Sequence, residues 1–106
     1  MLVDYTLVPL GSGTHLSSHI SKIVDIIDAS GLPYRLTPSG TCIEGEWDDI
    51  MNVLRDCQDE ARKRSSHIMS FIQIEDEVGE HSKLTRNIAS IEESLGRAVK
   101  HDLIEA

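Results

Sequence analysis

Three segments of the chain combine polar side chains with a backbone suited to holding a ligand. The first comprises residues 11–18, GSGTHLSS, which lead into a predicted helix. Free N–H groups and the helix dipole at such a junction favour an anion or a polar heteroatom. No Lys follows the glycines, so the segment is not a Walker phosphate-binding loop. An ordinary capped loop is the alternative interpretation.

The second segment, Thr37-Pro38-Ser39-Gly40-Thr41, has the composition of a hairpin turn between two strands. Glu44 and Glu46 follow at a spacing of two, which places both carboxylates on one face of an extended strand. They form either a solvated strand surface or, inside an oligomer interface, acceptors for a ligand amine. The third segment, Glu75-Asp76-Glu77, lacks the alternation of a calcium loop and reads as a solvated turn.

The remaining reactive side chains show no catalytic or metal-binding order. His15 and His19 lie four residues apart, but no catalytic Glu stands between them and no third ligand is marked. Cys42 and Cys57 are too few for a disulfide scaffold or a cysteine zinc site, and Cys57 has the setting of a small core residue. We therefore expect no enzyme activity, no catalytic residue, no metal and no cofactor.

Charge and hydropathy exclude further classes of protein. The 106 residues include 10 Lys and Arg against 18 Asp and Glu, a net charge of −8. This acidic excess argues against a nucleic-acid partner, because such binding depends on Lys and Arg displacing counterions. No run of about 18 apolar residues predicts a membrane span, and no basic flank predicts a signal peptide. We expect a cytoplasmic protein with no membrane partner.

The spacing of apolar residues predicts the strands and helices that position these three segments. Alternating residues predict strands over 2–10, 34–37, 41–46 and 67–75, the last apolar on both faces and therefore central. Helical spacing predicts helices that begin near Ser17 or Ser18, at Trp47 and at Ser82. This order predicts an α+β fold, a ferredoxin-like βαββαβ sandwich with an antiparallel sheet and an additional C-terminal helix. One domain over 1–98 and a flexible tail over 99–106 are expected.

Such a sheet has helices on one face only. Its uncovered face would expose apolar residues, and we expect these to be buried in a homo-oligomer whose open faces stack or whose edges pair.

Several short motifs, in this order and spacing, resemble the small thiamine-binding-protein family over residues 2–96. They are Pro9-Leu10-Gly11 with Ser17-Ser18, Gly40-Thr41 with Glu44, Ile74-Glu75-Asp76, and Asn87-Ile88-Ala89-Ser90-Ile91-Glu92. The resemblance implies a ferredoxin-like fold, a tetramer built as a dimer of dimers, and non-catalytic binding of thiamine or its hydroxymethylpyrimidine moiety. Gln73 and Glu77 stand where that family usually has Lys and Arg.

Carried over by position, the resemblance implies a ligand-binding role for five residues. They are Ser17, Ser18, Ser39, Thr41 and Glu44. A flat heterocycle also needs an aromatic wall, and of Tyr5, Tyr34, Trp47 and Phe71 we choose Tyr34, at the entrance of the hairpin. The net charge of −8 would attract the cationic thiazolium of thiamine. The alternative is a regulatory oligomer that binds sulfate or phosphate at residues 11–18.

Overall fold

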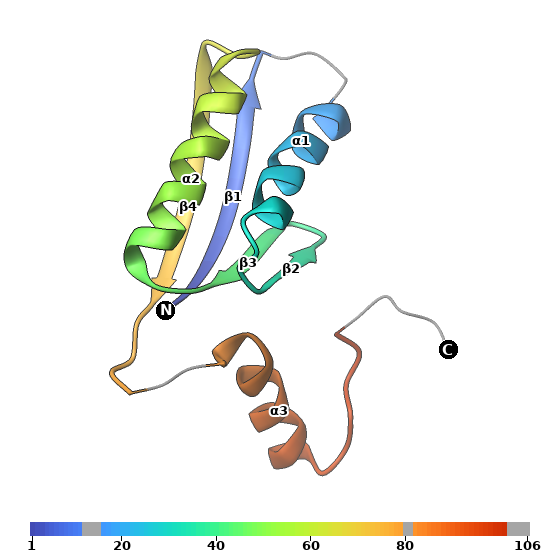
Figure 1. Cartoon of the computed structure of the whole chain (residues 1–106). Coiled ribbons are helices and arrows are strands. Elements are labelled where there is room, and N and C mark those ends of the chain that lie inside the picture. Colours follow the sequence, from blue (N-terminus) through green and yellow to red (C-terminus); the bar gives the residue numbers. More distant parts are fainter. Residues whose placement is uncertain (12–15, 80–81, 102–106) are drawn as a thin grey trace.

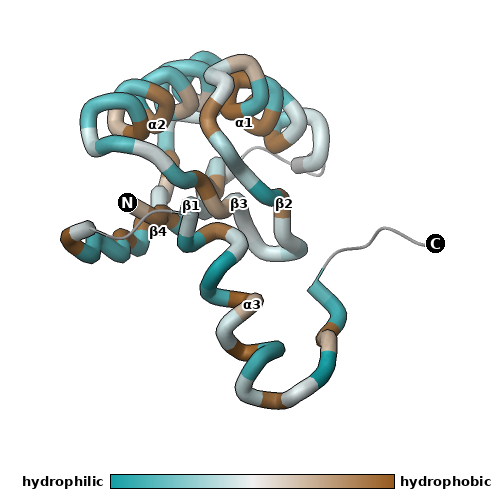
Figure 2. Tube along the Cα trace, turned by 60° about the horizontal axis from the view of Figure 1, so that its bottom comes forward, coloured by the Kyte–Doolittle hydropathy of each residue, from teal (hydrophilic) through white to brown (hydrophobic). Residues whose placement is uncertain are grey.

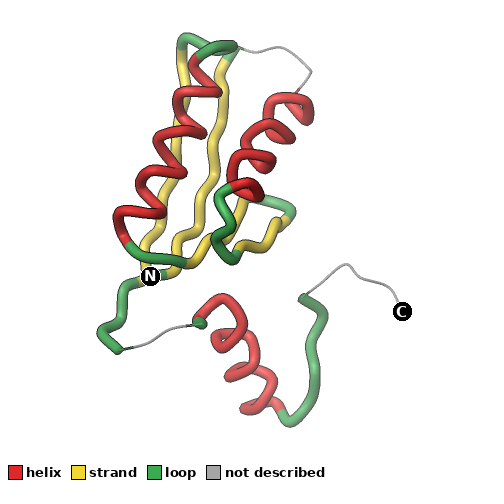
Figure 3. The backbone as a smooth tube through the Cα atoms, in the orientation of Figure 1, coloured by secondary structure: helices red, strands yellow, loops and turns green. Residues whose placement is uncertain are grey.

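A computed structural model describes residues 1–11, 16–79 and 82–101 of the chain. Its elements are β1 (Leu2–Leu10), α1 (Leu16–Ala29), β2 (Tyr34–Thr37), β3 (Gly40–Glu44), α2 (Trp47–Arg62), β4 (His67–Glu75) and α3 (Lys83–Leu95). Figure 1 shows their path, and Figure 3 separates helices from strands. The four strands form one sheet in the order β2-β3-β1-β4, and all three strand pairs are antiparallel. The predicted ferredoxin-like α+β fold with an additional helix is confirmed.

The main core lies between the sheet and the helices α1 and α2, which cover the same face of the sheet (Figure 2). Strand alternation places Val3, Tyr5 and Leu7 of β1 on this face, opposite apolar stripes of the two helices. The buried apolar residues are Val3, Tyr5, Leu7, Ile23, Ile27, Ile43, Ile50, Val53, Leu54, Cys57 and Ala61. Cys57 is therefore a core residue, as its sequence setting indicated.

The start of α2 agrees with the sequence prediction, whereas the start of α1 differs from it. Helix α2 begins at Trp47 and carries Asp48 and Asp49 in its first turn, where acidic side chains complement the dipole. Helix α1 begins at Leu16, so the prediction that Ser17 or Ser18 caps it is wrong. Both serines lie inside the first turn and are exposed.

Two expectations for the strands are also wrong. Among the described residues, β4 pairs only with β1 and forms an edge of the sheet, although its apolar residues on both faces predicted a central strand. Its second half is exposed on both faces: Phe71 is 54% exposed and Ile72 45%. Strand β3 ends at Glu44, and Glu46 serves as the backbone N-cap of α2, so the two carboxylates do not share a strand face.

Helix α3 lies on the opposite side of the sheet from α1 and α2 (Figure 2). It contacts β3, and none of its residues is buried. Its apolar stripe is half-buried at Leu84 and Ile88 but exposed at Ile91 and Leu95. The domain and tail boundaries stay predictions, since residues 102–106 lie outside the described part of the chain. Within that part, no helix is long and apolar enough to cross a membrane.

The core makes stability depend on pH in the alkaline range. Burial, reinforced by the nearby Asp56, raises the pKa of the Cys57 thiol from 9.0 to about 12. The unfolded chain therefore loses this proton at a lower pH than the folded chain does. Stabilisation by the protonated thiol is complete below pH 9 and is lost as pH rises through about 12.

We expect the free energy of unfolding of the wild type to decrease as the pH rises from 9 to about 12. This thiol should contribute about 1 kcal/mol per pH unit to that decrease. Urea denaturation at several pH values measures the slope. Cys57→Ala should be less stable at neutral pH but show a flatter decline. An equal slope in both proteins would contradict the assignment.

Candidate functional site

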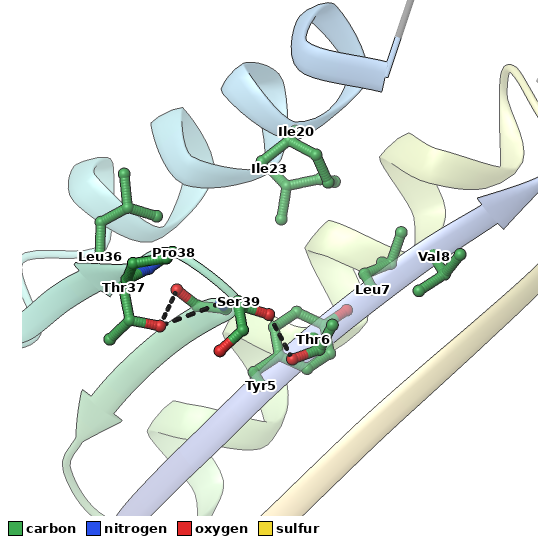
Figure 4. Close-up of a pocket in the computed structure, with 11 residues that line it drawn as sticks. Tyr5, Thr6, Leu7, Val8, Ile20, Ile23, Leu36, Thr37, Pro38 and Ser39 are labelled. Atoms are coloured by element: carbon green, nitrogen blue, oxygen red, sulfur yellow. Dashed lines mark hydrogen bonds between the residues drawn. The ribbon is translucent and has the colours of Figure 1, made fainter. Parts of the chain in front are cut away.

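A cavity of about 220 Å³ lies between the N-terminal half of α1, the middle of β1 and the hairpin that joins β2 to β3 (Figure 4). Most of its wall is apolar, and its polar groups belong to the hairpin and to Thr6. The lining residues are Tyr5, Thr6, Leu7, Val8, Ile20, Ile23, Leu36, Thr37, Pro38, Ser39 and Gly40. An apolar cavity with a few convergent polar groups is the usual form of a small-molecule site. We call it the hairpin cavity.

The hairpin cavity borders a strand edge without a partner strand. Strand β1 pairs with β4 from Leu2 to Leu10, but with β3 only from Leu2 to Tyr5. Beyond Tyr5, no strand in the described part of the chain pairs with β1 on the β3 side. Backbone N–H and C=O groups on such an edge are available to another hydrogen-bonding partner. The cavity thus offers both apolar walls and an unused strand edge.

The tip of the hairpin is held by its own hydrogen bonds. The Thr37 hydroxyl donates to the Gly40 carbonyl and accepts from the Gly40 N–H, both at 3.0 Å. The Thr6 hydroxyl donates to the Ser39 carbonyl, also at 3.0 Å, which ties the hairpin to β1. Figure 4 shows these bonds at one border of the cavity. The position of the polar border is therefore set by the fold before any ligand binds.

Tyr5 is the aromatic residue of the hairpin cavity, although the sequence pointed to Tyr34. The hydroxyl of Tyr5 is buried without a hydrogen-bond partner in the described part of the chain. Burial, and then the neighbouring Cys57, raise the pKa of this phenol, so it stays protonated. Tyr34 instead donates its hydroxyl to Asp28 at 2.7 Å and fastens β2 to α1. Alternation along β1 marks Tyr5 only as a core residue, so no sequence signal distinguished it.

The other predicted site residues are not gathered in one place. Ser39 lines the hairpin cavity, and Thr41 lies on the core face of β3, where it is 5% exposed. Ser17 and Ser18 lie in the first turn of α1. Residues 12–15 of the expected anion-binding loop lie outside the described residues. The structure thus brings only Ser39 of the five predicted positions to the cavity wall.

Glu44 lies on the opposite face of the sheet and binds the N-terminus of α3. Its carboxylate accepts hydrogen bonds from the Lys83 N–H at 2.6 Å and the Leu84 N–H at 3.2 Å. The N-cap residue, Ser82, has a left-handed backbone and makes no side-chain cap. Glu44, which belongs to β3, therefore supplies the helix cap that Ser82 does not. Its carboxylate already accepts hydrogen bonds from backbone amides, although the sequence indicated it as an acceptor for a ligand amine.

A second set of contacts fastens the same helix end. The Lys83 ammonium lies 2.6 Å from Glu77 and 3.6 Å from Glu75, and Asn87 donates to Glu75 at 3.1 Å. Glu75, the last residue of β4, and Glu77, two residues later, thus bind α3, where the sequence indicated only a solvated turn. Among the described residues, no group of three or more His, Cys, Asp or Glu could hold a metal ion.

Glu44→Ala should loosen α3 without unfolding the core, because the first amides of the helix lose their acceptor. We expect faster hydrogen exchange at Lys83 and Leu84, and a loss of about 1 kcal/mol, as for other helix caps. Glu46→Ala is the matched control, since Glu46 is exposed and makes no side-chain cap. Equal exchange rates in the two variants would rule out the capping role.

Gly40 permits the close approach of the hairpin to β1. A Cβ atom at this position would lie 2.6 Å from the Thr6 hydroxyl oxygen and 2.7 Å from the Tyr5 carbonyl oxygen. Gly40→Ala should therefore displace the hairpin and destabilise the protein by roughly 1–3 kcal/mol, as in other overpacked sites. Chemical denaturation measures this loss. Ser39→Ala, an exposed change in the same turn, should alter stability by less than about 0.5 kcal/mol.

The chain is similar to known proteins over most of its length. A family model described as thiamine-binding protein matches residues 3–92. A UPF0045 protein of Mycobacterium bovis is 26% identical over 98 residues, which span 92% of this chain and 96% of that protein. A UPF0045 protein of Eremothecium gossypii is 33% identical over 78 residues, which span 73% of this chain and 70% of that protein.

Two solved structures share the fold. A UPF0045 protein of Methanocaldococcus jannaschii superposes with a TM-score of 0.80 at 20% identity, covering 87% of this chain and 95% of that chain. A candidate thiamine biosynthesis/salvage protein of Thermotoga maritima superposes with a TM-score of 0.70 at 22% identity, covering 90% and 94%. At these identities the superpositions establish the fold alone.

Proposed function

Since the chain belongs to the thiamine-binding protein family, we propose that it is a non-catalytic binding protein for thiamine or its hydroxymethylpyrimidine moiety. The pyrimidine occupies the hairpin cavity, and the protein acts as a homo-oligomer, a dimer of dimers. The observation that carries this proposal is the combination of an apolar cavity with the unpaired edge of β1 beyond Tyr5.

The aminopyrimidine matches a strand edge chemically. Its exocyclic amine donates hydrogen bonds, and the adjacent ring nitrogen accepts one, as the C=O and N–H groups of a strand edge require. The ring faces are apolar and suit the walls formed by Ile20, Ile23 and Leu36. Because the hairpin holds Thr37 and Ser39 in place before binding, a ligand would not have to order them.

The size of the cavity favours one ring over a larger molecule. Its volume of about 220 Å³ is below the roughly 300–1,000 Å³ of sites that enclose drug-sized ligands. A single pyrimidine ring fits this space, whereas the thiazolium of thiamine would extend beyond it. The net charge of −8 then favours the cationic thiazolium outside the cavity and disfavours a phosphorylated ligand.

Titration calorimetry with hydroxymethylpyrimidine, thiamine and thiamine pyrophosphate tests this proposal. We expect the first two to bind and the pyrophosphate to bind more weakly. Ile20→Trp places an indole in the hairpin cavity and should abolish binding, because Ile20 lines it. Ser21→Trp adds the same ring at the next position, which is exposed and does not line the cavity, and should bind normally.

Three results would overturn the proposal. These are no heat of binding with any of the compounds at millimolar concentration, equal binding by the two tryptophan variants, or turnover of a bound compound. Stabilisation by sulfate but not chloride at equal ionic strength, lost on Ser17→Ala with Ser18→Ala, would favour the anion-binding alternative instead.

A further inference from the structure

Strand β1 directs its backbone groups alternately toward its two neighbours, and the positions that face β3 can be assigned. The Gly45 N–H donates to the Met1 carbonyl at 3.0 Å, and a Cβ atom on Gly40 would lie 2.7 Å from the Tyr5 carbonyl oxygen. The pairing of β1 with β4 runs without a bulge from Leu2 to Leu10. Odd-numbered positions of β1 therefore point their N–H and C=O groups toward β3, and even-numbered positions point theirs toward β4.

Leu7 is an odd-numbered residue of β1 that lies beyond the end of β3. Pairing with β3 stops at Tyr5, and among the described residues none is hydrogen-bonded to the Leu7 N–H or C=O on this side. Leu7 is only 6% exposed and lines the hairpin cavity. Because buried backbone groups rarely stay without a hydrogen bond, these two groups point to a molecule bound in the cavity.

Pro9 restricts the kind of molecule that this edge can bind. It is the next odd-numbered position of β1, and proline has no backbone N–H. A strand added to this edge would find no donor beyond Leu7, and proline is typical of strand edges that stay unpaired. A small planar molecule needs only one donor and one acceptor. The edge is therefore suited to a heterocycle and not to a peptide.

The Thr6 hydroxyl keeps this edge open. Tyr5 lies opposite Thr41, so two more steps of the same register would place Ser39 opposite Leu7. Instead, the Ser39 carbonyl accepts a hydrogen bond from the Thr6 hydroxyl at 3.0 Å (Figure 4). The Thr6 side chain lies on the opposite face of β1 from Tyr5 and Leu7. This bond therefore holds the turn away from the Leu7 backbone.

We propose that the Leu7 backbone recognises the ligand of the hairpin cavity and that Thr6 is a positioning residue that keeps this backbone available. The Leu7 carbonyl accepts a hydrogen bond from the exocyclic amine of the pyrimidine, and the Leu7 N–H donates to the ring nitrogen beside that amine. The ligand class is thus a flat heterocycle with a donor and an acceptor on neighbouring atoms. This inference rests on the proposed function for the identity of the ligand.

Removal of the Leu7 N–H alone tests the recognition. Native chemical ligation at Cys42 joins a synthetic segment 1–41, in which an ester replaces the Leu7 amide, to an expressed segment 42–106. By calorimetry, hydroxymethylpyrimidine should bind this ester protein about tenfold more weakly than the wild type, the effect of one hydrogen bond. An analogue with C–H in place of the ring nitrogen beside the amine lacks the acceptor. It should bind both proteins equally, which also shows that the ester protein is folded.

Thr6→Val removes the hydroxyl but keeps the shape of the side chain, and Thr6→Ser, which keeps the hydroxyl, is the matched control. Without ligand, hydrogen exchange of the Leu7 amide should become about tenfold slower relative to Tyr5 in Thr6→Val, because the released Ser39 carbonyl can accept from it. Binding of hydroxymethylpyrimidine should weaken in the same variant. Thr6→Ser should match the wild type in both measurements.

The results separate this inference from the proposed function. If hydroxymethylpyrimidine binds the ester protein and the wild type equally, recognition by Leu7 is wrong and the proposed function stands. If Thr6→Val matches Thr6→Ser in exchange and in binding, the positioning role of Thr6 is wrong. If the wild type binds no pyrimidine compound, the proposed function is wrong and recognition by Leu7 fails with it.

Discussion

Unequal pairing of β1 with its two neighbours determines most of what distinguishes this molecule. Strand β1 has nine residues, all of them paired with β4 but only the first four paired with β3. The short β3 turns back at the hairpin, and Gly40 lets that turn approach β1 closely. The rest of the β1 edge faces the space under α1. The apolar cavity and its unused backbone groups are thus consequences of one strand being shorter than its neighbour.

The role of Glu44 shows how a carboxylate can be satisfied within the chain. A half-buried carboxylate needs hydrogen bonds, and the N-terminus of a helix without a side-chain cap needs acceptors. Glu44 and α3 meet both needs together, while Lys83 joins the same helix end to the acidic turn after β4. This arrangement anchors one end of α3 and leaves Ile91 and Leu95 exposed near the other. The open side of the sheet is therefore partly covered near β3.

Local elements could be predicted closely because their signals are local. The alternation of residues 2–10 and 67–75 matches the observed strands, and the helix after Ser82 matches α3. The position of β4 could not be predicted in this way. Apolar residues on both faces of a strand indicate burial on both faces, but the burying partner need not belong to the same chain. Periodicity also could not show that Glu46 occupies the N-cap position of α2 and is not a strand residue two positions after Glu44.

The sequence by itself determined the element order, the ferredoxin-like α+β fold and the family, because periodicity, turn residues and motif spacing are properties of neighbouring positions. Only the tertiary structure decided which side chains meet. Ser39 and Tyr5 both line the hairpin cavity. Tyr34 is hydrogen-bonded to Asp28 instead, and Glu44 accepts hydrogen bonds from the first residues of α3. Such contacts join residues far apart in the chain, and their geometry depends on strand length and register, which no short motif records.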